Sequence, residues 1–129
     1  MDENKLKIII KRLRELDTDK KIKFIVLFGS HANGYANSKS DIDLAIYYDS
    51  DKKSRAKFRI KVLGKLTDSY DIQIFQDLPL YVRIEVLKGK VLYNNIYQDT
   101  FDIYMDTINE YERFKPRLDM YYKAVEAGL

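Results

Sequence analysis

The sequence contains no cysteine, and it holds one histidine, two prolines and five glycines among its 129 residues. Without cysteine the chain can form no disulfide framework, no thiolate metal site and no thiol nucleophile. A single histidine, His31, excludes a zinc site built from several histidines. The longest apolar run, Phe24 to Phe28, is far shorter than the roughly 20 residues of a membrane-spanning helix. Any demanding chemistry should therefore depend on carboxylates, hydroxyls or a bound metal ion.

The composition is that of an ordinary folded domain, and we expect residues 1–129 to form one. Hydrophobic residues make up 46% of the chain, which is enough to bury a core and argues against disorder. The net charge is +3, from 23 basic and 20 acidic residues, so direct nucleic-acid binding is not expected. The first five residues do not resemble a secretory signal. We therefore expect a cytoplasmic protein with no membrane partner.

The charges are unevenly spread, because residues 52–67 hold seven basic side chains and no acidic one. The rest of the chain then carries sixteen basic and twenty acidic residues. A basic helix of this kind is usually a solvated face. It could also attract phosphate beside an acidic site, or contact RNA or an acidic partner.

Hydrophobic periodicity predicts an α/β fold with three main strands and helices between them. The strands are expected at residues 22–28, 42–48 and 70–75, with a short edge strand at 91–93, and the helices at 4–16, 52–66, 80–87 and 96–127. Asp17 and its polar neighbours should end the first helix by competing for its backbone. Pro116 should kink or split the last helix, because it removes an amide donor.

The most informative pattern is Gly29-Ser30 followed, after ten residues, by Asp41-Ile42-Asp43. Gly29 ends a strong strand, and without a side chain it lets another backbone or a phosphate approach closely. Asp41 and Asp43 should project from one face of the next strand, because side chains two residues apart share a face. Two such carboxylates repel each other unless a cation lies between them, and Mg²⁺ with phosphate oxygens suits that site.

Asp71 extends this acidic site if the strand at 70–75 lies beside the strand at 42–48. Asp71 and Gln73 should share one face of their strand, while Ile72 and Ile74 occupy the other. Three carboxylates could hold two metal ions roughly 3.5–4 Å apart, the spacing that clamps the attacking and leaving oxygens in phosphoryl transfer. His31 beside Ser30 also suggests a Ser/His hydrolase, but no third group follows in a recognisable order.

The segments Leu27–Gly34 and Ser40–Leu44 resemble the signature of polymerase-β-like nucleotidyltransferases. The resemblance is closest to the minimal nucleotidyltransferases, the antitoxin half of HEPN/MNT toxin–antitoxin pairs. It continues through Tyr70-Asp71-Ile72 and Leu87–Tyr93 to the C-terminal helix. It implies a small mixed sheet flanked by helices, with a long C-terminal helix.

The resemblance also implies roles for individual residues. Gly29, Ser30 and Ser40 would bind the nucleotide, and the three aspartates would be both metal ligands and catalytic residues. Those aspartates are Asp41, Asp43 and Asp71. The implied reaction is Mg²⁺-dependent transfer of AMP from ATP to a tyrosine of a HEPN ribonuclease toxin.

One position departs from the family pattern, since Asn33 stands where the family commonly has an arginine. An amide cannot neutralise phosphate charge as a guanidinium does. Lys39 or a basic residue of the helix at 52–66 could compensate.

Two other functions are open at this point. The chain could neutralise its partner by binding alone, with catalysis weak or lost, or it could transfer a nucleotide to a small molecule such as an aminoglycoside.

Residues 96–127 bear on neutralisation by binding, because the helix expected there is rich in tyrosine. Its tyrosines are more than one docking face requires, which favours an interface with a toxin or a second copy. They are Tyr97, Tyr104, Tyr111, Tyr121 and Tyr122.

Overall fold

The computed structural model describes residues 3–29, 42–66 and 69–128. Its elements are α1 (Glu3–Leu16), β1 (Ile22–Phe28), β2 (Ile42–Tyr48), α3 (Lys52–Leu63), β3 (Tyr70–Ile74), a 3₁₀ turn (Phe75–Asp77), α4 (Leu80–Leu87), β4 (Lys90–Asn94) and α5 (Tyr97–Glu126). The predicted α/β class is confirmed. Among the described helices, none is long and apolar enough to cross a membrane.

The strands form one mixed sheet in the order β3-β2-β1-β4. β1 pairs antiparallel with β2 and with β4, whereas β2 and β3 run parallel. A parallel pair needs a crossover connection, and α3 provides it. The predicted edge strand is confirmed as β4.

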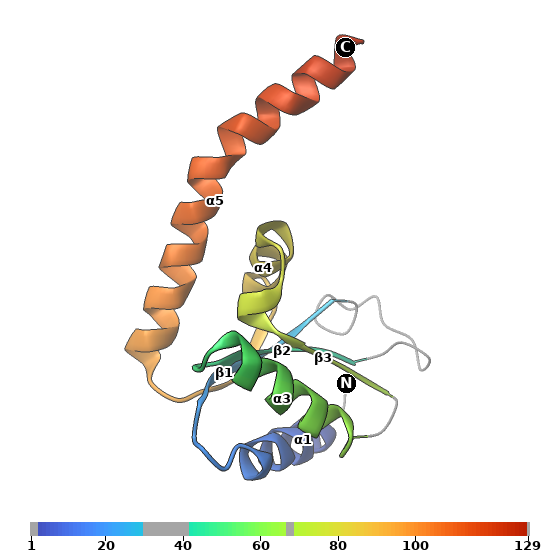
Figure 1. Cartoon of the computed structure of the whole chain (residues 1–129), viewed down its shortest axis with the longest axis vertical. Coiled ribbons are helices and arrows are strands. Elements are labelled where there is room, and N and C mark those ends of the chain that lie inside the picture. The colour runs from blue at the N-terminus through green and yellow to red at the C-terminus, as the bar shows by residue number, and fades with distance from the viewer. Residues whose placement is uncertain (1–2, 30–41, 67–68, 129) are drawn as a thin grey trace.

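Helices cover both faces of the sheet (Figure 1). On one face, α1 and α3 pack their buried side chains, among them Leu13 and Phe58, on Leu44 and Ile72. On the other face, α4 and the first half of α5 cover a smaller cluster. Its fully buried members are Phe24, Val26, Ala45, Phe75 and Val86. This two-sided burial leaves one end of the sheet for the polar groups described below.

Local hydrogen bonds explain where several elements begin and end. The buried carboxylate of Asp17 accepts from the backbone amides of Lys21 and Ile22, both at 2.9 Å, which confirms that Asp17 ends α1. The Asp51 carboxylate caps α3 by accepting from the Ser54 amide at 2.8 Å. That bond also lowers the pKa of Asp51.

Three predicted elements were too long, and the helix predicted at 96–127 exceeds α5 by one residue at each end. The helix predicted at 52–66 ends at Leu63, because the chain leaves the helix at Gly64. The strand predicted at 70–75 ends at Ile74, the last residue of β3 that pairs with β2. Beyond it the Gln76 side chain, rather than a strand backbone, accepts the hydrogen bond from the Tyr48 amide at 3.2 Å.

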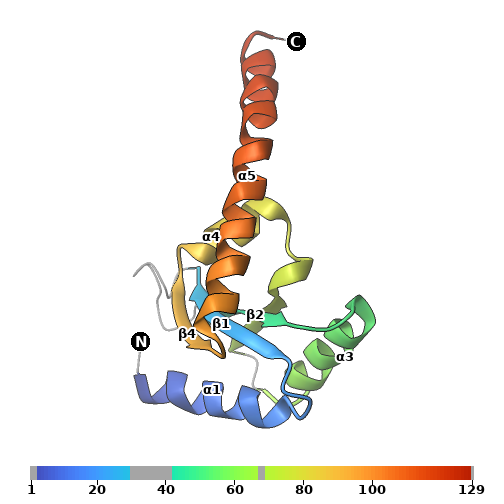
Figure 2. The ribbon, with the colours of Figure 1, turned by 90° about the vertical axis from the view of Figure 1, so that its left-hand side faces the viewer.

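The last helix continues through Pro116 as one element from Tyr97 to Glu126. Figure 1 shows α5 bending along its course, so the proline bends the helix rather than splitting it. Figure 2 shows the C-terminal half of α5 extending beyond the sheet and the other helices.

Candidate functional site

One end of the sheet gathers four chain segments that are distant in sequence. β1 ends there at Phe28, and β2, β3 and β4 all begin there. The pairing partners fix this arrangement: Phe28 lies opposite Asp43, Asp43 opposite Asp71, and Leu27 opposite Lys90. Polar side chains at this end therefore lie close together although the chain connecting them is long.

Asp43 and Asp71 are direct neighbours on the parallel strands β2 and β3. Neighbouring strands lie about 4.8 Å apart, and opposed residues project from the same face. The adjacent residues Ile42, Leu44 and Ile72 are buried on the α1/α3 face, so the two carboxylates lie on the α4/α5 face. Both aspartates are half-buried. The structure thus brings together the two predicted aspartates that it describes.

Gly29 lies against the Asp43 carboxylate. Its φ of +73° is in the left-handed region that favours glycine. A Cβ atom at this position would overlap Asp43 Oδ2, so a larger residue would displace the carboxylate. Within the described chain, the group that approaches Gly29 is therefore the Asp43 side chain, whereas the sequence predicted a backbone or a phosphate there.

Gln73 holds Asp71, a contact that sequence reasoning missed. The Gln73 side-chain amide donates a hydrogen bond to Asp71 Oδ1 at 3.0 Å. The strand alternation placed both residues on one face but assigned no role to Gln73. An amide donor two residues after a carboxylate on the same strand is the sequence signal that could have identified the pair.

The remaining predicted site residues, Ser30, Ser40 and Asp41, lie outside the described residues. His31, Asn33 and Lys39 lie outside them as well. Within residues 3–29, 42–66 and 69–128, no group of three or more metal-ligating side chains occurs. Asp43 and Asp71 offer carboxylate oxygens, which are the ligands that Mg²⁺ prefers. The donor chemistry of the described part of the site therefore fits Mg²⁺.

The basic helix α3 lies across the sheet from the two carboxylates. α3 packs Phe58 and Val62 on the face of the sheet opposite to the two carboxylates. Three of its cations have structural partners. Arg55 pairs with Asp77 at 2.7 Å, Arg59 donates to the Ile72 carbonyl at 2.8 Å, and Lys61 donates to the Leu16 carbonyl at 2.8 Å. The suggestion that this helix attracts phosphate to the site is therefore not supported.

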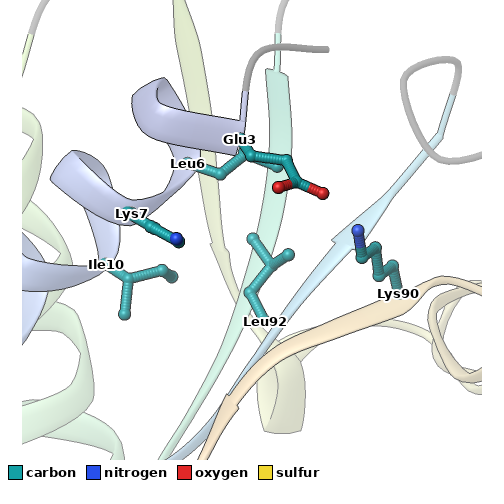
Figure 3. A pocket seen from close by; sticks show the side chains of 6 residues that line it. All are labelled: Glu3, Leu6, Lys7, Ile10, Lys90 and Leu92. Atoms are coloured by element: carbon teal, nitrogen blue, oxygen red, sulfur yellow. The ribbon is translucent and has the colours of Figure 1, made fainter.

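A pocket of about 330 Å³ lies between α1 and β4 (Figure 3). Its apolar part is formed by Leu6, Ile10 and Leu92, and Glu3, Lys7 and Lys90 lie around it (Figure 3). It lies on the α1 side of the sheet and includes neither Gly29 nor an aspartate. It is therefore separate from the candidate site.

Comparison with known proteins places this geometry in a family. Residues 9–98 match the family model described as polymerase beta, nucleotidyltransferase. A 72-residue segment is 38% identical to a protein of Methanocaldococcus jannaschii named "Putative protein adenylyltransferase MJ1547". The match covers 55% of this chain and 55% of that protein, so the chain spans about half the length of this curated relative.

Solved structures match over nearly the whole chain. A chain from the toxin–antitoxin structure with AMP-PNP is 27% identical, with a TM-score of 0.75, and the match covers 98% of this chain and 99% of that chain. A chain from the complex of tri-AMPylated Shewanella oneidensis HEPN toxin with MNT antitoxin is 24% identical. Its TM-score is 0.73, with 98% of this chain and 99% of that chain covered, a likeness of fold. Because the family model spans well over half of its length, the chain belongs to the polymerase beta nucleotidyltransferase family.

Proposed function

We propose that this protein is an antitoxin that transfers AMP from ATP, with Mg²⁺, to a tyrosine hydroxyl of a HEPN-type toxin. One observation carries the proposal: Asp43 and Asp71 stand side by side at the end of the sheet, beside Gly29, in a chain of a nucleotidyltransferase family. We place the reaction in the cytoplasm. Residues 1–129 would act as one nucleotidyltransferase domain, with residues 96–127 as its interface extension.

We assign some of the site residues to binding the metal ion and the others to binding the nucleotide. Asp43 and Asp71 would hold Mg²⁺ together with Asp41, which precedes β2 in the sequence. The bound metal would neutralise phosphate charge and orient the α-phosphate. Gly29, Ser30 and Ser40 would bind the triphosphate, because a strand end without a side chain can present backbone amides to an anion.

The chain's own groups would then position the two reactants. The acceptor hydroxyl oxygen forms a bond to the α-phosphorus, the bond from that phosphorus to the bridging oxygen breaks, and pyrophosphate leaves. The hydroxyl proton would pass to a carboxylate, and we assign this role to Asp71, whose orientation is supported by the hydrogen bond that the Gln73 amide donates to its Oδ1 oxygen at 3.0 Å. Positioning and charge neutralisation would supply most of the rate enhancement.

The comparisons support this reaction over other nucleotidyl transfers. The archaeal relative is named "Putative protein adenylyltransferase MJ1547", a name that assigns it a protein acceptor. A chain 27% identical to this one belongs to a toxin–antitoxin structure that contains the ATP analogue AMP-PNP. Both findings favour a protein acceptor over an aminoglycoside-type small molecule.

Neutralisation by binding alone is the second candidate. The observation that favours it is the C-terminal half of α5, which extends away from the rest of the chain and carries exposed apolar residues such as Tyr122. A toxin bound there could be inhibited without any transfer.

The two candidates separate in a labelling experiment with the purified HEPN-type toxin that we propose as the partner of this protein. ATP labelled on the α-phosphate and ATP labelled on the γ-phosphate are compared in the presence of Mg²⁺. We expect label on a toxin tyrosine from the α-labelled ATP only, with release of pyrophosphate. Neutralisation of the toxin with neither label transferred would favour binding alone.

A further inference from the structure

Tyr111 and Glu112 of α5 still line a pocket with Tyr81 and Lys88 of α4, but beyond them the C-terminal part of α5 extends away from the rest of the described chain (Figures 1 and 2). The first half of the helix is docked: the Tyr104 ring lies 5.6 Å from the Phe24 ring, and Glu110 pairs with Arg83 at 3.3 Å. We call residues Tyr111–Glu126 the distal segment. It is helical throughout and carries exposed apolar side chains, including Phe114, Tyr122 and Val125, which are 45%, 55% and 53% exposed. Such a cluster on one projecting helix is typical of a binding surface.

Many of the large apolar residues of α5 fall on a heptad spacing, although others, such as Phe114 and Met120, lie off it. Alternating steps of four and three residues connect Tyr97, Phe101, Tyr104, Ile108, Tyr111, Lys115, Leu118, Tyr122 and Val125. This spacing averages 3.5 residues, so the seam winds slowly around the helix and faces another helix where the two supercoil, as in a coiled coil. The expected occupant of the distal segment is therefore an α-helix.

A parallel second copy of this chain is a poor occupant because of Lys115. Lys115 is the one charged residue in the seam, and Tyr111 and Leu118 are its neighbours along it. In a parallel pair, equivalent positions face each other, so two lysine ammonium groups would meet inside the interface. A single polar residue in such a seam selects the partner at a cost in stability.

An antiparallel second copy is disfavoured by a different set of charges. Glu112, Asp119 and Glu126 are spaced seven residues apart and flank the seam on one side. In an antiparallel pair this flank lies against the same flank of the other helix, so acidic residues would face acidic residues. Like charges at these positions oppose pairing and thereby exclude partners.

We propose that the distal segment binds an α-helix of the toxin whose apolar seam is flanked by lysine or arginine and places an acidic side chain opposite Lys115. The identity of that partner rests on the proposed function. The choice of a different protein over a second copy rests on the charges of the distal segment. The basic flank of the toxin helix would pair with Glu112, Asp119 and Glu126.

The test compares two variants that add the same charge to opposite sides of the helix. Leu118 lies in the seam, whereas Met120, which is 71% exposed, points away from it. Toxin affinity is measured by calorimetry for wild type, L118E and M120E. We expect L118E to weaken binding about 30-fold or more and M120E by no more than about two-fold, as for a buried contact and a peripheral one. Circular dichroism of each variant checks that α5 stays helical.

A third variant tests the acidic flank. The combined change E112K, D119K and E126K should weaken toxin binding about ten-fold or more, because it places lysines against the basic residues of the partner. Sedimentation velocity of the wild-type protein alone should show a monomer at concentrations that saturate the toxin.

Three results would overturn the inference. L118E and M120E could bind the toxin equally tightly, the charge-reversed variant could bind as well as wild type, or wild type could form a dimer that L118E dissociates. The proposed function fails separately: if wild type binds the toxin through the seam but transfers no AMP, only the enzymatic proposal is wrong.

Discussion

Asp43 of β2 and Asp71 of β3 lie directly opposite each other in a parallel register, on the face of the sheet that α4 and α5 cover. Their positions are fixed by backbone pairing, so the two carboxylates stay adjacent whether or not a ligand is bound. Gly29 lies against the Asp43 carboxylate, and Gln73 holds the Asp71 carboxylate. Each carboxylate therefore has a neighbour whose replacement should affect the site in a predictable way.

Gly29→Ala should lower both activity and stability. The left-handed φ of +73° costs an alanine roughly 1–2 kcal/mol, and the new methyl group would displace the Asp43 carboxylate. Urea unfolding and the AMP-transfer rate should both report the change.

Gly64→Ala is the matched control for that variant. Gly64 has a φ of −71°, and an added Cβ would meet its nearest neighbour, the Ile60 carbonyl oxygen, at an ordinary 3.5 Å. This variant should be neutral or more stable by about 0.4–1 kcal/mol, because it restricts the unfolded chain. Equal losses of stability in the two variants would contradict the account of Gly29.

Gln73→Met should impair catalysis without unfolding the protein. The change keeps the side-chain volume but removes the amide that donates to Asp71 Oδ1. Replacing a residue that orients a metal ligand typically lowers metal affinity or activity about 10–100-fold. We expect a higher Mg²⁺ concentration at half-maximal rate and an unchanged urea midpoint. An unchanged Mg²⁺ dependence would show that Gln73 does not position Asp71.

Tyr104→Phe should stabilise the protein slightly. Among the described residues, the Tyr104 hydroxyl is buried with no hydrogen-bond partner, so removing it relieves a desolvation cost of about 1–3 kcal/mol at most. Urea unfolding near pH 8 measures the difference, and a clear loss of stability would contradict it.

The same variant should also change the stability at high pH. Burial raises the pKa of Tyr104 to about 12 from its ordinary value of 10. Between these pH values the unfolded chain loses the proton while the folded chain keeps it, so wild type loses stability relative to Tyr104→Phe as pH rises from about 10 to 12. The urea midpoint of wild type should fall more steeply over this range than that of Tyr104→Phe. Parallel pH curves would show that burial does not raise this pKa.

Local pattern was sufficient to predict most of the elements. Strand β1 was identified from its β-branched and aromatic run, and α4 from Pro79 and a short apolar period, with bounds that match. The shared face of Asp71 and Gln73 followed from strand alternation alone. The adjacency of Asp43 and Asp71 could be predicted only on the condition that their two strands are neighbours, because strand alternation does not say which strands pair.

The rest depended on contacts between residues distant in sequence. Nothing local tells which face α3 covers, and so the basic helix was considered a candidate for phosphate attraction although it lies across the sheet from the carboxylates. The contact of Gly29 with Asp43 arises from antiparallel pairing across a long connection. Pro116 bends α5 without splitting it, because the helix continues on both sides of the missing amide.

The most direct test of the account is AMP transfer by Asp43→Asn. The substitution preserves the volume of a half-buried side chain and removes the charge that we assign to metal binding. We expect transfer from α-labelled ATP to the HEPN toxin to fall by about 1,000-fold or more, since the charge neutralisation that carries the reaction is lost. The urea midpoint and the toxin affinity should stay near those of wild type. Transfer at the wild-type rate by a folded Asp43→Asn protein would contradict the central claim.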